Sequence, residues 1–175
     1  MNLAYLLDIL KYTIAGLGVV YVAFYLFKPY LDRSESLQLL EFKKAISTQT
    51  LPLKLQAYER IVLFIERINP ANMLIRLNGP DYSAAELHSL IVAEIRNEFQ
   101  HNISQQIYVS HTAWDVVRRL KDDTLSITTN AVKALPETAT GLELSKTILT
   151  HLSKLNDNPY DMGTALIRKD LEQLF

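Results

Sequence analysis

The chain of 175 residues is 49% hydrophobic, which allows one sizeable core, and its 18 basic and 19 acidic residues leave a net charge of -1. A near-neutral chain lacks the positive surface with which proteins bind a phosphate backbone, so we expect no nucleic-acid partner. The absence of cysteine excludes disulfide bonds, thiolate metal ligands and cysteine nucleophiles.

The first predicted element is a membrane-spanning helix. The segment 12–27 carries no charged residue and, at 1.5 Å per residue, spans roughly 24 Å, against about 30 Å for the hydrocarbon core of a bilayer. A start at Ile9 closes that gap, with Lys11 and Lys28 extending their ammonium groups to the bilayer surface. Residues 1–33 are therefore predicted to form a membrane anchor. It should stay attached, because no small-residue cleavage site follows it.

The distribution of positive charge predicts the orientation of this anchor. Four basic residues follow the apolar segment and one precedes it: Lys28, Arg33, Lys43, Lys44 and Lys11. Because basic residues favour the cytoplasmic side, we expect the N-terminus outside and the rest of the chain in the cytoplasm. A core helix of a soluble protein is the alternative, although a segment that is hydrophobic all round is typical of a membrane span.

A short helix and a hinge are predicted next, over residues 34–50. Apolar residues recur through 34–46 with charged residues between them, and the polar run 47–50 follows. We interpret the polar run as the hinge. In one version of this hypothesis the helix rests on the bilayer, with Lys43 and Lys44 near anionic headgroups.

Residues 51–175 are predicted to form one cytoplasmic helical domain. Pro52 suits a first helical turn and opens a helix that ends before Pro70. A short helix over 70–77 then leads to a turn at 78–80. Since no stretch alternates between apolar and polar residues with a period of two, the predicted fold class is all-α, an irregular bundle of five or six helices.

Capping signals mark the starts of the later helices. The segments 83–86 and 140–143 have the spacing of capping boxes, and they open helices that should reach about residues 108 and 155. Ser110 or Thr112 can cap the helix between them. Asn158 followed by Pro159 has the pattern of the last helix start.

No catalytic residue, cofactor site or metal site can be assigned from motifs. The chain has no G-x-S-x-G, no glycine-rich phosphate loop and no H-E-x-x-H. The closest pattern is Glu98-x-x-His101 preceded by Glu94, because E-x-x-H on a helix places a carboxylate and an imidazole on one face. A dinuclear centre needs a second such motif, which the sequence lacks. A metal-dependent enzyme or sensor would therefore have to pair two chains.

Charged residues on two predicted helices form the candidate interaction surface. Glu-Arg pairs at 59–60 and 66–67 recur after seven residues on a helix that is otherwise apolar. On the next long helix an apolar stripe turns polar from Glu94 onward. Solvation is the simplest interpretation of both strips, and ion pairing between helices or contact with a protein partner are the alternatives. The candidate residues are Glu59, Arg60, Glu66, Arg67, Glu94, Glu98, His101 and Gln105.

Two stretches of the chain resemble a known group of proteins. AYERIVLFIERINP at 57–70 and EIRNEFQHNISQQIYVSHTAW at 94–114 are similar to segments of membrane-anchored proteins of the Bacteroidota, a family of unknown function. The resemblance covers most of the chain, from the hydrophobic anchor to a C-terminal helix ending in Leu174 and Phe175. It implies a bacterial, single-span helical protein, placed in the inner membrane. It implies no catalytic residue and no ligand.

These observations favour a membrane-anchored interaction or scaffold protein over an enzyme. Lipid would cover the anchor, and the helical domain would bind other proteins or a second copy of itself. The alternative is a metal-dependent enzyme or sensor that uses the Glu/His stripe.

Overall fold

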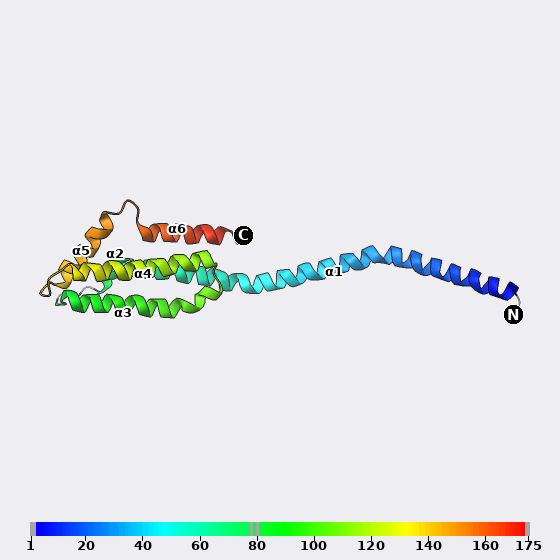
Figure 1. Ribbon diagram of the computed structural model, residues 1–175, viewed down its shortest axis with the longest axis horizontal. Coiled ribbons are helices and arrows are strands. Elements are labelled where there is room, and N and C mark those ends of the chain that lie inside the picture. Colours follow the sequence, from blue (N-terminus) through cyan, green and yellow to red (C-terminus); the bar gives the residue numbers. More distant parts are fainter. Residues whose placement is uncertain (1–2, 78, 80, 174–175) are drawn as a thin grey trace. The chain divides into compact units, whose positions relative to one another are not determined.

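The computed structural model describes residues 3–77, 79 and 81–173. Its α-helices and one 3-10 helix, η1, are α1 (Leu3–Ile68), α2 (Pro70–Leu77), α3 (Ala84–Asn102), η1 (Ile103–Ile107), α4 (His111–Lys133), α5 (Gly141–Ser153) and α6 (Pro159–Glu172) (Figure 1). The all-α prediction is confirmed, since β pairing in these residues is limited to one isolated bridge. Asn78 and Pro80 of the predicted turn, and Leu174 and Phe175, lie outside the described residues.

The predicted helix end at Ile46, the hinge at 47–50 and the helix start at Pro52 are wrong, because α1 is helical through all of these positions. The hydroxyl groups of Thr48 and Thr50 donate hydrogen bonds to the carbonyl oxygens four residues earlier, at 2.8 and 2.9 Å. These bonds satisfy polar side chains inside a helix, so a run of them does not require a turn. A single proline removes one backbone hydrogen bond and need not end a helix.

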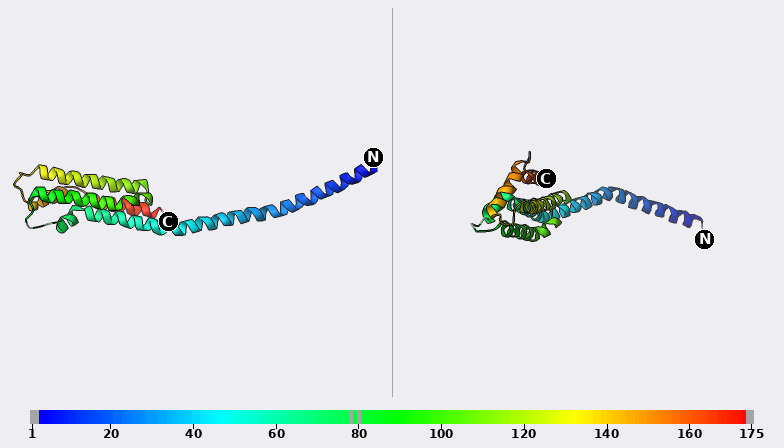
Figure 2. Two further views of the ribbon diagram at one scale, coloured as in Figure 1. Left: turned by 90° about the horizontal axis from the view of Figure 1, so that it is seen from below. Right: turned by 60° about the vertical axis from the view of Figure 1, so that its left-hand side comes forward.

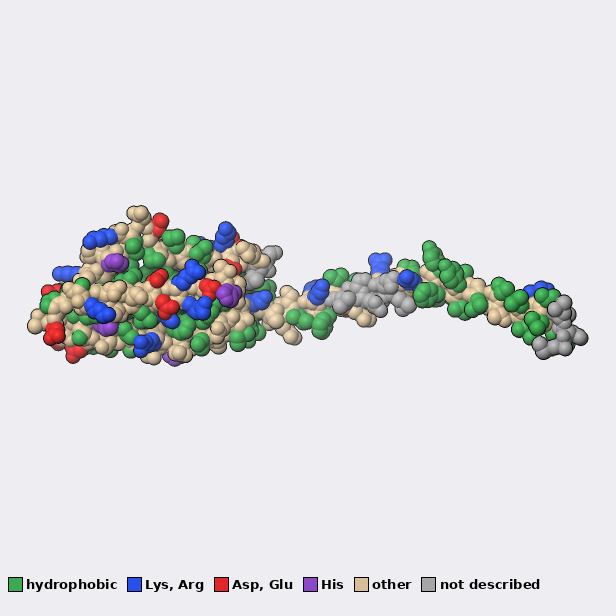
Figure 3. All heavy atoms as spheres, in the orientation of Figure 1, with side chains coloured by type: hydrophobic (Ala, Val, Ile, Leu, Met, Phe, Trp, Pro, Cys, Tyr) green, Lys and Arg blue, Asp and Glu red, His purple; other side chains and the backbone are tan. Residues whose placement is uncertain are grey.

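The contacts of the chain divide it into two units, Met1–Thr50 and Leu51–Phe175. In the first unit, the segment Tyr5–Tyr30 of α1 is long and apolar enough to cross a membrane, and none of its most apolar window is buried. Its 26 residues would extend about 39 Å as a helix. Figure 3 shows mostly hydrophobic side chains along this segment.

The second unit has a continuous apolar core. Helix α3 lies beside α4, and α6 runs along α4 (Figures 1 and 2). The last part of α1 packs against this group through Phe64, whose ring meets that of Phe99 edge to face at 6.1 Å. The largest fully buried side chains are Tyr160, Phe64, Ile61, Ile65, Ile68, Met73, Leu87, Ile91, Ile95, Leu144, Ile148 and Ile167.

The predicted caps at both capping boxes are confirmed. The side chains of Ser83 and Thr140 each accept a hydrogen bond from the backbone N–H of the glutamate three residues later, and the carboxylate of that glutamate accepts one from the backbone N–H of the cap residue. These two caps also lie together, because Gly141 N donates to Tyr82 O at 2.7 Å and Ala84 N to Ala139 O at 2.9 Å. The starts of α3 and α5 are therefore fastened to each other.

Helix α3 ends earlier than predicted. It stops at Asn102 and continues as the 3-10 helix η1 instead of reaching residue 108 as an α-helix. The Asn102 side chain donates to the carbonyl oxygen of Glu98 at 2.8 Å, and this local bond competes with the regular helical pattern. Ser110, not Thr112, then caps α4.

We expect the stability of the bundle to fall in mild acid because of His88. Its Nε2 lies 3.3 Å from the Thr129 hydroxyl on α4, and burial lowers its pKa below the ordinary value of 6.5. The unfolded chain therefore binds a proton at a higher pH than the folded one does. The contribution of His88 should leave the free energy of unfolding at its highest value above about pH 6.5. That free energy should then decrease as the pH falls from about 6.5 through the lower pKa of the folded protein.

Urea unfolding at a series of pH values measures this effect. The substitution His88→Gln should flatten the curve between pH 5 and 7, and His151→Gln, at an exposed position of α5, serves as the matched control. An unchanged slope in the His88→Gln protein would show that this histidine does not carry the effect.

Candidate functional site

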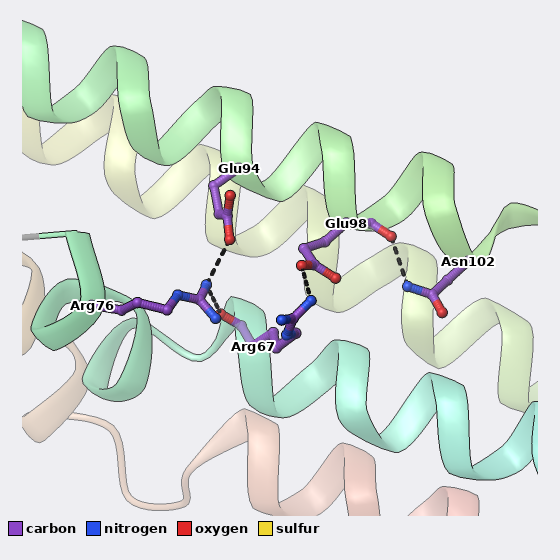
Figure 4. Close-up of polar contacts among 5 residues, drawn as sticks. All are labelled: Arg67, Arg76, Glu94, Glu98 and Asn102. Carbon is purple, nitrogen blue, oxygen red and sulfur yellow. Dashed lines mark hydrogen bonds and ion pairs between the residues drawn. The ribbon is translucent and has the colours of Figure 1, made fainter.

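Three residues of the predicted interaction surface, together with Arg76, form ion pairs where α1, α2 and α3 meet. Arg67 of α1 pairs with Glu98 of α3, and Arg76 of α2 pairs with Glu94 of α3 at 2.8 Å (Figure 4). Arg76 Nη2 also donates to the backbone oxygen of Arg67 at 3.3 Å. The pairs thus join three helices, which was one of the alternatives left open by the sequence.

The Arg67–Glu98 pair is asymmetric in its burial. The Glu98 side chain is 11% exposed, whereas that of Arg67 is 55% exposed. A buried carboxylate is costly unless a cation and hydrogen-bond donors compensate it, so Glu98 depends on Arg67 more than Arg67 depends on Glu98. The interpretation of this stripe as a solvated face is therefore wrong for Glu98.

The position of Glu98 follows from the buried face of α3. Leu87, Ile91 and Ile95 are fully buried, and Glu98 and Asn102 continue the same face at helical spacing. Asn102 is also buried, and its Oδ1 atom has no hydrogen-bond partner among the described residues. The core of the bundle thus becomes polar toward the end of α3.

The other predicted residues lie apart from this cluster. Glu66 is exposed and accepts a hydrogen bond from Asn72 Nδ2 at 3.1 Å. Gln105 lies in η1 and is half-buried. Three residues remain exposed and form no ion pair or side-chain hydrogen bond within the part of the chain that the structure describes: Glu59, Arg60 and His101.

The arrangement gives no support to the metal-dependent alternative. Glu98 turns toward Arg67, while His101 is exposed. In the described ranges, no group of three or more histidine, aspartate or glutamate side chains is placed to hold a metal ion. In the E-x-x-H motif, Glu98 therefore forms an ion pair and the imidazole of His101 is exposed. The reason is that Arg67 of the neighbouring helix reaches the carboxylate.

A hydrogen-bond network that sequence reasoning missed joins α1, α4 and α6. The Asp170 carboxylate accepts hydrogen bonds from the Tyr58 hydroxyl and, at 2.7 Å, from the Ser110 hydroxyl. Ser110 N also donates to the Tyr58 oxygen at 3.3 Å. Burial and then the bond to Asp170 raise the pKa of Tyr58. Tyr58 and Asp170 are 112 residues apart, and no local pattern signals such a contact.

An aromatic cluster lies between α3 and α4. The rings of Phe99 and Trp114 stack at 5.5 Å, and the Lys121 ammonium lies 4.5 Å from the centre of the Phe99 ring. Such pairs contribute about 1 kcal/mol each beyond the apolar area they bury. With the ion pairs and the Tyr58 network, they set how α1, α3 and α4 align.

We expect the two halves of the Arg67–Glu98 pair to differ in their effect on stability. The substitution Arg67→Ala leaves a buried carboxylate without its cation and should cost about 3 kcal/mol. The substitution Glu98→Ala leaves a half-exposed guanidinium that water can solvate, so its cost should be about 1 kcal/mol. Chemical denaturation of the variants measures both values.

Two further variants complete this experiment. Arg96→Ala, at an exposed position on α3, should change stability by less than about 0.5 kcal/mol and controls for helix propensity. The double variant Arg67→Leu with Glu98→Leu should recover most of the loss, because it strands no charge. Equal losses for Arg67→Ala and Glu98→Ala would contradict the asymmetry.

Comparison with known proteins gives a family and no function. Neither the curated proteins nor the solved structures contain a match to this chain. The model of a family of unknown function, DUF7935, matches residues 4–174, which is nearly the whole chain and includes the apolar segment Tyr5–Tyr30, the ion-paired helices and α6. The chain therefore belongs to the DUF7935 family, a family of unknown function.

Proposed function

We propose that the chain is a single-span membrane protein whose helical domain is an interaction or scaffold module on the cytoplasmic side of a bacterial inner membrane. The anchor is the segment Tyr5–Tyr30 of α1, and the domain is the unit Leu51–Phe175. Lipid would surround the anchor, and the domain would bind protein.

The observation that carries the proposal is the exposure of the apolar side chains of this segment. Large side chains such as Tyr12, Leu17 and Phe24 are each more than half exposed, and the whole stretch is apolar around the helix. Soluble proteins rarely expose so long a continuous apolar surface to water. The segment is about 39 Å long, so it can cross a hydrocarbon core of about 30 Å with its two ends among the lipid headgroups.

The orientation rests on the charges that flank the segment. Lys28 lies near its C-terminal end and Arg33 just after it, with Lys43 and Lys44 further on, whereas Lys11 near its N-terminal end is paired with Asp8 at 3.7 Å. Basic residues favour the cytoplasmic face, which puts the N-terminus outside. The bacterial inner membrane follows from the resemblance to proteins of the Bacteroidota.

The interaction role rests on which charged residues remain available. Arg67, Glu94 and Glu98 are used within the bundle, so they are poor candidates for binding a partner. Arg60, Glu59 and His101 are exposed, and of these Arg60 lies on α1 seven residues before the ion-paired Arg67, with Glu59 next to it. We therefore restrict the proposed protein-binding surface to these three residues.

The anchor is tested by extraction and by labelling of introduced cysteines, for which the cysteine-free chain needs no prior changes. Full-length protein should remain in the membrane pellet after carbonate treatment. A membrane-impermeant maleimide added to intact spheroplasts should label Tyr5→Cys and should label Asp157→Cys, in the exposed loop before α6, only after lysis.

Two outcomes would contradict these expectations separately. Release of the protein by carbonate would reject the membrane span. The opposite labelling pattern would keep the span and reverse the orientation.

The protein-binding surface is tested by the double variant Arg60→Ala with His101→Ala. Because both side chains are exposed, stability should change by less than about 1 kcal/mol. In native membranes, this variant should crosslink to few or none of the proteins that crosslink to the natural chain. A matched variant at exposed Lys133 and Lys154 should keep them, and retention of every crosslinked protein by the Arg60/His101 variant would reject this surface.

A further inference from the structure

Residues of α1 between the segment Tyr5–Tyr30 and Thr50 also expose large apolar side chains. Phe42 is 65% exposed and Ile46 is 46% exposed. The segment Tyr5–Tyr30 already exceeds the hydrocarbon thickness, so residues around 42–49 lie beyond it when that segment spans the bilayer. A helix without packing partners is only marginally stable in water, which makes an unpartnered apolar face here costly.

The spacing of these residues is that of a coiled coil. Phe42 and Ile46 are four apart and Gln49 follows after three, which corresponds to heptad positions d, a and d. In the sequence, Leu39 occupies the preceding a position. Lys44 and Thr48 fall on the opposite side of the helix, at positions f and c, together with the exposed Leu37 and Leu40. Phe42, Ile46 and Gln49 therefore share one face with the spacing of a coiled coil.

We propose that two copies of the chain associate in parallel through this face, the stripe of Phe42, Ile46 and Gln49 on α1. The proposal rests on the membrane anchoring proposed above and names the self-association partner. Anchors in one bilayer give all copies the same direction and the same height, so identical stripes meet in register. Confinement to the membrane also raises the effective concentration of one copy near another.

The charges beside the stripe are compatible with a second copy. In a parallel coiled coil, a residue at position e lies next to the g residue of the preceding heptad on the other helix. Lys43 would therefore face Gln38 and not another lysine, while Ala45 at the next g position would face Thr50. No like charges meet across this interface.

The test is disulfide crosslinking of single cysteines in native membranes containing the full chain. Because the natural sequence has no cysteine, each variant has one reactive thiol. The variants are Phe42→Cys and Ile46→Cys in the stripe and Lys44→Cys and Thr48→Cys as controls on the opposite side. A copper–phenanthroline oxidant converts adjacent thiols to a disulfide, and non-reducing gels show the doubled mass.

The stripe cysteines should give at least about fivefold more crosslinked dimer than the control cysteines, because a and d residues of two parallel helices lie against each other while f and c residues point away from the partner. Equal crosslinking at all four positions would indicate random collision and would overturn the proposal. Absence of crosslinking at 42 and 46 would overturn it as well.

The same samples separate this proposal from the anchoring on which it rests. Carbonate extraction of each variant reports whether the chain spans the membrane, independently of any disulfide. A chain that resists carbonate but gives no stripe-specific dimer keeps the anchor and rejects self-association. A chain that washes off rejects both, since the common height of the two copies then has no cause.

Discussion

The buried carboxylate of Glu98 is the constraint around which the helical domain is arranged. Its side chain is almost enclosed, and the guanidinium of Arg67 is the cation that makes this burial possible. Since the two residues belong to antiparallel segments of α1 and α3, their pairing sets the register of the two helices. Phe64 of α1 then meets Phe99 of α3, and Tyr58 of α1 meets Ser110 at the start of α4.

Polar contacts inside the domain extend this alignment to α6. Asp170 accepts hydrogen bonds from Tyr58 and Ser110, and the Tyr160 hydroxyl lies 2.7 Å from that of Thr124 on α4. Burial raises the pKa of Tyr160 to about 12, which keeps the hydroxyl neutral near physiological pH. Because each of these groups is hydrogen-bonded, their burial specifies the positions of the helices at little cost in desolvation.

Helix α1 contributes to both units through different surfaces. From Ala57 to Ile68 it buries a stripe at helical spacing in the core, whereas the segment Tyr5–Tyr30 exposes apolar residues all around. These are the surfaces expected of a helix packed on one face by protein and of a helix surrounded by lipid. The proposed membrane span rests on this difference.

Local patterns in the sequence were sufficient for the all-α class and for most helix starts. The capping boxes at Ser83 and Thr140 and the Asn158 cap are formed as predicted, because they involve residues two or three apart. The continuity of α1 was missed because the Thr48 and Thr50 hydroxyls bond to the helix instead of ending it. Only the tertiary structure decided that Glu98 is buried, that His101 is exposed and that Asp170 reaches Tyr58. Each of these depends on a neighbouring helix tens of residues away in sequence, and spacing along one helix carries no information about which neighbour arrives there.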